Sequence, residues 1–231
     1  GWHRQVVGAS FRGAGVCMSP PLLLAAENLP AVVLPRPVKA GLDPSFFDVV
    51  EQRKSIRNYA DTPLSLDQIS RLLWYTARIR RRITAYAESE QAYEGCSRPV
   101  AGGGGLHEID LYLTVRRCSG LEAGLYRYDP HGHQLLRLSA LSEACQQLLL
   151  EACQSAGLTQ EPDILINLAA RYGRVTWKYE GIPYALILKH VGVIYQQLYL
   201  VATALGLAPC GLGAGNSETF AEATGLDRFA H

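Results

Sequence analysis

The chain has 231 residues, of which 48% are hydrophobic and 19% are charged, a composition typical of a folded globular domain with a substantial core. Its 22 Lys and Arg residues against 21 Asp and Glu give a formal net charge of +1, so we expect neither nucleic acid nor a membrane surface as a partner. The six cysteines include no CxxC pair, which argues against zinc and a disulfide framework and favours a reduced, cytoplasmic compartment.

Residues 1–42 are rich in Gly and Pro and lack periodicity, so we interpret them as an N-terminal arm or linker ahead of a domain over 43–231. The stretch DPSFFDVVEQR predicts a short helix ending near Arg53, with Asp43 as the cap and Pro44 at the first helical position. SLDQISRLLWYTARIR predicts a clearer helix, because Ser65 and Gln68 have the spacing of a capping box.

The middle of the chain predicts strands. IDLYLTVRR, residues 109 to 117, is enriched in β-branched and aromatic residues, and GLYRYDPHGHQLLRL resembles a hairpin with DPHGH as its turn. His131 and His133 would then be solvated turn residues. LSEACQQLLLEACQSAG predicts a helix ending at Gly157, and DILINLAARY, 163 to 172, is short and apolar enough for an internal strand.

The run from Ala185 to Leu207 has the length of a membrane span, but it contains polar residues that would be costly in hydrocarbon. We therefore expect a central helix buried by protein, in which Lys189 and His190 are packed or interface groups. SETFAEATG adds a short capped helix. Mixed strands and helices without regular βαβ alternation indicate an α+β sandwich.

Three segments carry candidate chemistry. In RKSIR, 53 to 57, an extended backbone would put Arg53, Ser55 and Arg57 on one face as a phosphate cradle; the alternative is a solvated basic loop. SRPVAGGGGLHEIDLYL and LAPCGLGAGN contain glycines that let a flat ligand approach the backbone, or else form a surface loop and a helix stop. Neither has the GxGxxG spacing of a Rossmann site.

WKYEGIPYALILKHVGVIYQQ places Lys178 and Tyr179 just ahead of the long apolar helix. An isolated lysine usually lies at the surface, where Glu180 would be its partner. Burial beside Trp177 and Tyr184 would instead favour the neutral amine that a general base requires.

These motifs, in this order, resemble the FMN-dependent nitroreductase superfamily from about Phe46 to Leu226, and specifically its SagB-type branch of azoline dehydrogenases, which form thiazoles and oxazoles in ribosomal peptides. The resemblance implies a nitroreductase-like sandwich with a central mixed or antiparallel sheet flanked by helices, and a homodimer in which FMN binds between subunits near the long helix. It implies Lys178 and Tyr179 as the catalytic pair. The implied FMN-binding residues are Arg53, Lys54, Ser55, Arg57, Arg98, Pro99, Gly103, Gly104, Gly105, Gly211, Leu212, Gly213 and Gly215.

The implied reaction removes a proton and a hydride equivalent from an azoline ring of a peptide, with molecular oxygen reoxidising the flavin and a cyclodehydratase as a possible partner. Two alternatives stay open. The chain could be a nicotinamide-dependent nitro or flavin reductase, or a flavin-containing scaffold subunit of a heterocycle synthetase that performs no chemistry.

Overall fold

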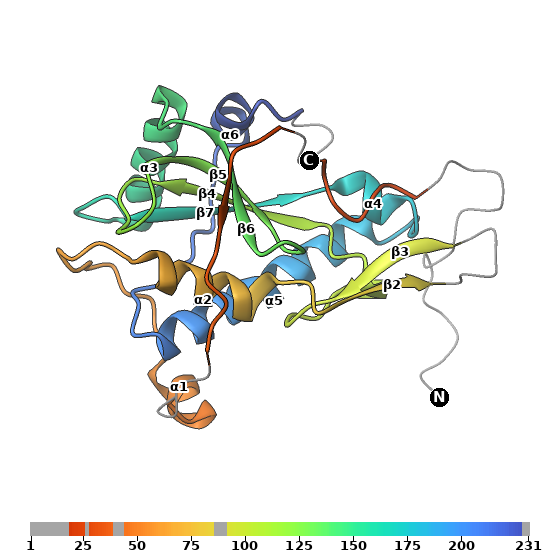
Figure 1. The fold of residues 1–231 in the computed structure, drawn as a ribbon, viewed down its shortest axis with the longest axis horizontal. Coiled ribbons are helices and arrows are strands. Elements are labelled where there is room, and N and C mark those ends of the chain that lie inside the picture. The colour runs from red at the N-terminus through yellow and green to blue at the C-terminus, as the bar shows by residue number, and fades with distance from the viewer. Residues whose placement is uncertain (1–18, 26–27, 39–43, 86–91, 228–231) are drawn as a thin grey trace.

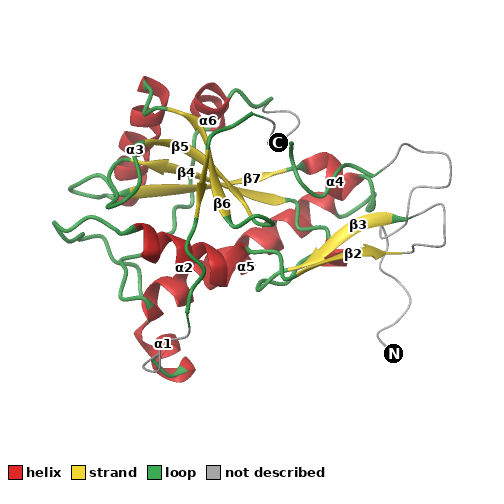
Figure 2. Cartoon of the chain, viewed as in Figure 1, coloured by secondary structure: helices red, strands yellow, loops and turns green. Residues whose placement is uncertain are grey.

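The computed structural model describes residues 19–25, 28–38, 44–85 and 92–227. A five-stranded antiparallel sheet has the order β1-β6-β5-β4-β7. Helices α3 and α6 cover one face and α2 and α5 the other (Figure 1), and a separate two-stranded hairpin, β2 and β3, projects beside α5 (Figure 2). The strands are β1 Ala31–Val33, β2 Arg81–Ala85, β3 Tyr93–Ser97, β4 Ile109–Val115, β5 Gly124–Asp129, β6 Gln134–Ser139 and β7 Ile164–Ala170. The helices are α1 Phe46–Gln52, α2 Leu66–Ala77, α3 Glu143–Ala156, α4 Tyr172–Thr176, α5 Pro183–Ala204 and α6 Ser217–Thr224, with a 3-10 turn, η1, at Gly103–Gly105.

The helix ends follow from local hydrogen bonds. The capping box predicted for α2 is confirmed: the Gln68 amide donates to Ser65 Oγ at 3.2 Å, and the Ser65 amide donates to Gln68 Oε1 at 2.9 Å. Helix α1 begins later than predicted, because its cap is Ser45, whose Oγ accepts from the Asp48 amide at 3.2 Å. Pro44 therefore precedes the cap, and Asp43 lies outside the described residues.

Strand β4 lies between β5 and β7, and its seven residues are all buried. The predicted strand at 163 to 172 exists as β7, but the prediction that it is internal is wrong. Among the described residues β7 pairs only with β4 and forms an edge of the sheet, and most of its side chains are half-buried. A short apolar run alone does not distinguish a central strand from an edge strand that a helix covers.

The predicted hairpin is confirmed as β5 and β6. His131 is exposed as expected, but His133 is only 3% exposed. Its Nδ1 lies 2.8 Å from the Tyr128 hydroxyl and its Nε2 lies 2.8 Å from Ser70 Oγ. The expectation of a solvated His133 is therefore wrong, because Ser70 of α2 and Tyr128 of β5 each satisfy one ring nitrogen.

The segment expected to form an arm contributes to the domain in its described part. Strand β1 pairs with β6, and Leu22 is fully buried. The guanidinium of Arg171 donates to the Pro21 carbonyl at 2.6 Å and to the Leu22 carbonyl at 2.9 Å. These contacts attach the N-terminal segment to the end of β7.

Helix α5 is the only described helix whose length and apolar composition would suit a membrane span. One side of it packs on the domain, with Ile187, His190 and Ile194 buried. The opposite side remains at the surface of the single chain: Tyr184 is 64% exposed and Leu188 is 52% exposed. The described residues of one copy thus cover only part of this apolar helix, so the burial on most sides that we expected does not occur among them.

Candidate functional site

Lys178 lies just after the short helix α4 and points inward, with only 6% of its surface exposed. Its Nζ donates a hydrogen bond to the Tyr93 hydroxyl and sits 4.2 Å from the centroid of the Tyr93 ring. The Tyr179 ring centroid is 5.5 Å from the same nitrogen. This burial contradicts the alternative of a solvated surface lysine, and the aromatic neighbour is Tyr93 rather than the exposed Tyr184.

The glycine-rich segment passes directly against this amine. The Tyr93 hydroxyl donates to the Gly104 carbonyl at 2.7 Å, so one hydroxyl links Lys178 to the backbone of η1. Gly104 has a φ of 61°, and a Cβ at this position would lie 2.4 Å from Lys178 Nζ and 3.1 Å from the Tyr179 hydroxyl. The backbone conformation therefore favours glycine here, and an added Cβ would displace the end of the Lys178 side chain.

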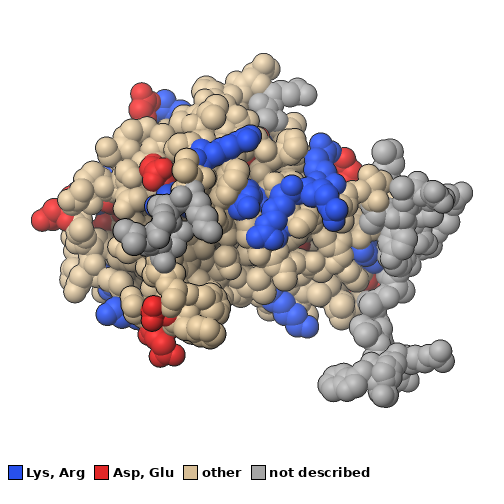
Figure 3. Space-filling model, turned by 60° about the horizontal axis from the view of Figure 1, so that its bottom comes forward, with Lys and Arg blue, Asp and Glu red and all other residues tan. Residues whose placement is uncertain are grey.

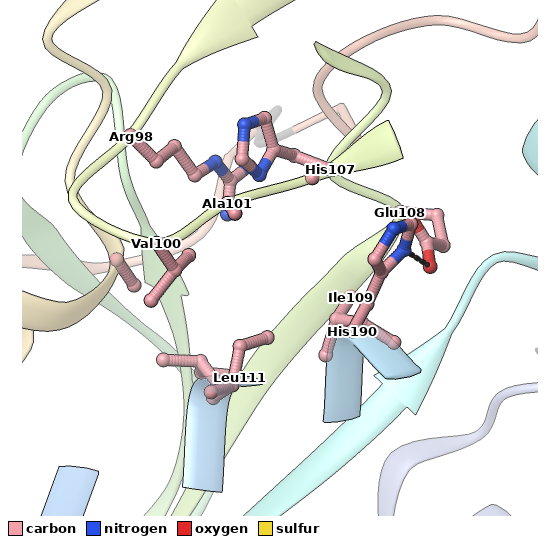
Figure 4. Close-up of a pocket in the computed structure, with 11 residues that line it drawn as sticks. Arg98, Val100, Ala101, His107, Glu108, Ile109, Leu111 and His190 are labelled. Atoms are coloured by element: carbon pink, nitrogen blue, oxygen red, sulfur yellow. Dashed lines mark hydrogen bonds and ion pairs between the residues drawn. The ribbon is translucent and has the colours of Figure 1, made fainter. Parts of the chain in front are cut away.

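A buried histidine and carboxylate hold the preceding residue of the turn. The Gly103 amide donates to His190 Nε2 at 2.8 Å, and His190 Nδ1 lies 2.7 Å from Glu108 Oε1. Because Nε2 accepts a hydrogen bond, the ring proton must lie on Nδ1 and point at the carboxylate, which is fully buried. Figure 4 shows this pair at the edge of a small pocket.

The same pocket receives Arg98 and His107 (Figure 4) and has a cavity of about 10 Å³, roughly the space of one water. Burial, followed by the charge of Arg98, lowers the pKa of His107 to about 3. Arg98 is 7% exposed, yet its Nε and Nη2 atoms have no hydrogen-bond partner among the described residues. A buried guanidinium in this condition indicates a polar group still to be bound. Pro99 follows it, half-buried.

Arg174 ties this end of the molecule together. It is 1% exposed and donates to the Leu106 carbonyl at 2.7 Å, to the Pro20 carbonyl at 2.5 Å and to the Glu94 carbonyl. Burial lowers its pKa to about 10. Glu94 lies in β3 and Leu106 directly follows η1, so Arg174 joins the hairpin strand to the glycine turn.

The second group of predicted residues lies near the other end of α5. Ser55 Oγ is 2.8 Å from the Tyr199 hydroxyl, and the Arg53 guanidinium carbon lies 5.3 Å from the Tyr199 ring centroid. The Gly211 amide donates to the same hydroxyl at 2.6 Å. The structure therefore brings the RKSIR segment and the second glycine segment together at one tyrosine. Lys54 is exposed beside them.

The remaining members of this group differ in their contacts. Arg57 does not join Tyr199, because its Nε donates to the Ala156 carbonyl at the end of α3 at 2.9 Å. The Leu212 carbonyl accepts from the Tyr195 hydroxyl at 2.9 Å. Gly213 and Gly215 are exposed, and a Cβ at either position would meet no atom of the described chain within 4 Å. The described part of the chain therefore leaves room for a side chain at these two positions.

The two groups lie apart along α5. His190 belongs to the first and Tyr199 to the second, and nine residues of α-helix correspond to about 14 Å along the axis. On one chain, the buried lysine and the RKSIR segment thus form two partial sites. Among the described residues, no group of three His, Cys, Asp or Glu could hold a metal ion.

Sequence reasoning missed three residues of this site. Tyr93 and Tyr199 contact predicted site residues that are far away in the sequence, and Glu108 is linked to the predicted Gly103 through His190. The usable signal was an acidic residue after the glycines and a histidine inside an apolar helix, since buried polar groups require partners.

The comparisons with known proteins fit this geometry. Residues 50–231 match the nitroreductase family model. The chain is 31% identical over 167 residues to the protein MJ1384 of Methanocaldococcus jannaschii, which is named as a nitroreductase; the match covers 72% of this chain and 77% of that protein. It is also 31% identical over 153 residues to the trifolitoxin-processing protein TfxB of Rhizobium leguminosarum bv. trifolii, where it covers 62% of this chain but only 38% of TfxB.

Among solved structures, the chain is similar in fold to a chain of the E. coli microcin synthetase McbBCD complex with truncated pro-MccB17 bound. The TM-score is 0.59 at 20% identity, and the match covers 88% of this chain and 74% of the other. The predicted α+β sandwich is confirmed, and the chain belongs to the nitroreductase family, whose members are oxidoreductases that generally bind FMN.

Proposed function

We propose that this chain is an FMN-dependent oxidase that converts azoline rings in a peptide to azoles. The observation that carries the proposal is the buried Lys178, held by Tyr93 against the glycine turn at Gly104. A flavin reductase that only passes hydride needs no buried amine beside its glycine turn, whereas an enzyme that also removes a carbon-bound proton needs a base. The likeness to a trifolitoxin-processing protein supports a peptide as substrate.

FMN is the proposed cofactor, and the chain offers groups that fit it. The half-buried Arg53 and the exposed Ser55 would hold the phosphate, because a guanidinium and a hydroxyl can both donate hydrogen bonds to its oxygens. The unpartnered nitrogens of Arg98 would meet a polar edge of the flavin. The open glycines Gly213 and Gly215 would let its flat ring approach the backbone.

We further propose that the complete site is shared by two copies. The Lys178 group and the RKSIR group are about 14 Å apart along α5, and the apolar outer side of α5 is left uncovered by one chain. A two-fold interface along α5 would cover that side and could place each partial site beside the complementary one of the partner.

In the proposed reaction, the Cα–H bond of the azoline breaks and its proton passes to Lys178 Nζ, while a hydride equivalent leaves the adjacent ring carbon. Bound FMN would supply the electron acceptor, and molecular oxygen would take the electrons afterwards. The Tyr93 hydroxyl holds the amine in place, and Tyr179 would orient the ring or relay the proton. A cyclodehydratase, which forms azolines, is the corresponding proposed partner. We propose the cytoplasm as the compartment, because the five cysteines among the described residues are free thiols, as a reducing environment keeps them.

The test is single-turnover oxidation of a synthetic thiazoline peptide by FMN-loaded protein, with the loss of two hydrogens per ring read by mass spectrometry. Lys178→Ala should lower the rate by about 10² to 10⁴, as for loss of a positioned base, while FMN absorbance is retained. Lys178→Met, which keeps the packing of the stem, should lose as much. Tyr179→Phe should cost less. Normal turnover by Lys178→Met would refute the proposal.

The same preparations distinguish the alternatives. Rapid bleaching of the flavin by NADPH, with no azole formed from the peptide, would identify a nicotinamide-dependent reductase. Retained peptide binding without bleaching or azole formation would identify a scaffold subunit.

A further inference from the structure

A second cavity, which shares no lining residue with the pocket beside His190, has an unusual lining. It has a volume of about 340 Å³ and lies between the end of α2, the turn of the β5–β6 hairpin and the segment after β1. Three of its lining residues are arginines, and none is Asp or Glu. Its lining residues are Arg36, Trp74, Arg78, Ile79, Arg80, Pro130, His131 and His133.

The three guanidiniums have no carboxylate to neutralise them among the described residues. Arg78 donates to the Trp74 carbonyl at 2.7 Å and stacks over the Trp74 ring at 4.5 Å, which fixes its position without balancing its charge. The nearby charge of Arg80 adds to burial in lowering the pKa of Arg78. By contrast Arg82, two residues further along, is paired with Glu94 at 2.5 Å. Mutually repelling cations around a cavity attract an anion.

The shape of the cavity favours a side chain over a bare ion. Its volume corresponds to roughly ten waters of liquid, and Ile79, Pro130 and the Trp74 indole add apolar wall beside the charges. His133 contributes no free donor, because Ser70 and Tyr128 occupy both of its nitrogens. Arginine forks match the geometry of carboxylates. An acidic side chain, with its methylene stem on the apolar wall, satisfies both parts of the lining.

An extended backbone also has a place to lie beside the cavity. Strand β1 is an edge strand, and its outer side has no partner strand among the described residues. The chain leaves β1 through Leu34, whose amide donates to the His133 carbonyl at 3.1 Å, and reaches Arg36 in the cavity wall. A peptide added along this edge would carry its side chains toward the arginines. On the face drawn in Figure 3, Lys and Arg side chains gather in one region with few acidic ones among them.

We propose that this cavity binds a glutamate or aspartate side chain of the substrate peptide, away from the ring that is oxidised. The proposal rests on the proposed action on peptides and adds to it a substrate preference: acidic residues flanking the azoline. Binding here would position the peptide and would take no part in the chemistry.

The first experiment measures binding alone, with the FMN-loaded full chain and a fluorescent azoline-free peptide that carries three glutamates. The double variant Arg36→Gln, Arg80→Gln should weaken binding about tenfold at low salt. Arg82→Gln, a neighbouring arginine already neutralised by Glu94, should change it less than twofold. A peptide with glutamines in place of the glutamates should not bind measurably.

Several results would overturn this inference. The first is a loss of peptide affinity in Arg82→Gln equal to that of the double variant, and the second is equal binding of the glutamine peptide. The third is displacement of the peptide by inorganic phosphate at concentrations below those of the peptide, which would indicate a site for small oxyanions. The second experiment uses azoline peptides: the double variant should raise KM for the acidic peptide and leave kcat unchanged. If no azole forms with any variant while acidic-peptide binding keeps its dependence on the arginines, the proposed function fails and the anion site stands.

Discussion

Replacing Gly104 by alanine separates backbone strain from damage to the site. Gly104 has a φ of 61°, in the left-handed region, where a residue with a Cβ loses about 1–2 kcal/mol. For a chain of this size each kcal/mol corresponds to about 2–4 °C in Tm. Gly104→Ala should therefore lower Tm by roughly 2–8 °C through strain alone.

The added methyl also has a local consequence. The Cβ would lie 2.4 Å from Lys178 Nζ, so the amine must leave its position beside the Tyr93 hydroxyl. Since Lys178 is the proposed base, azoline oxidation should fall by about 10² or more. The FMN content of each variant is read by absorbance and turnover is expressed per bound flavin, because Gly104 is itself one of the residues predicted to bind FMN.

Gly157 provides the matched control. Its φ is 62°, and a Cβ there would meet no atom of the described chain within 4 Å. Gly157→Ala therefore carries the same backbone strain without the steric contact, and we expect a similar loss of Tm with normal turnover. Differential scanning calorimetry and the single-turnover assay give both quantities. If Gly104→Ala oxidises the peptide as fast as Gly157→Ala, the reasoning that places Lys178 at the reacting carbon is refuted.

Three further predictions concern other parts of the molecule. Leu188→Glu should convert the proposed dimer to monomers in light scattering and reduce bound FMN, because it puts a charge on the exposed apolar side of α5; an unchanged dimer would contradict an interface there. Ser55→Ala should weaken FMN binding several-fold, as read by flavin release on dilution. Tyr199→Phe should weaken it as well, because it removes the hydroxyl that contacts Ser55 and accepts from the Gly211 amide. The pKa of His107 is lowered to about 3 in the folded chain, whereas an unfolded histidine has a pKa of about 6.5. Between these pH values the unfolded chain binds a proton that the folded chain does not bind. Stability should thus fall as pH drops from about 6.5 toward 3, and His107→Asn should flatten that dependence in urea titrations; identical curves would show that the buried ring does not contribute.

Local sequence patterns predicted most helices and the β5–β6 hairpin, because capping and turn chemistry act over a few residues. Ser65 and Gln68 are three positions apart, and both hydrogen bonds of their capping box form. The position of β7 at a sheet edge and the burial of His133 depend instead on which elements pack together. No pattern within either segment contains that information.

The same distinction applies to the site. Lys178 and Gly104 were recognised individually, but the residue that joins them, Tyr93, lies 85 positions from the lysine. His190 and Glu108 are 82 positions apart. Each of these groups is costly to bury without a hydrogen-bond partner. The sequence therefore indicates that partners exist, but only the fold shows which residues they are.

The position of Tyr93 on the β2–β3 hairpin connects the two proposals. The hairpin strand β2 begins at Arg81, directly after the Arg80 of the basic cavity, and the paired strand β3 begins at Tyr93, which holds Lys178. The backbone of Arg80 is itself joined to the far end of β3, since its amide donates to the Ser97 carbonyl at 2.7 Å. A peptide anchored by an acidic side chain at Arg80 would therefore contact the same two-stranded element that positions the amine. In this arrangement the spacing between the acidic residue and the azoline would decide which ring reaches Lys178, and hence which ring of a multiply cyclised peptide is oxidised first.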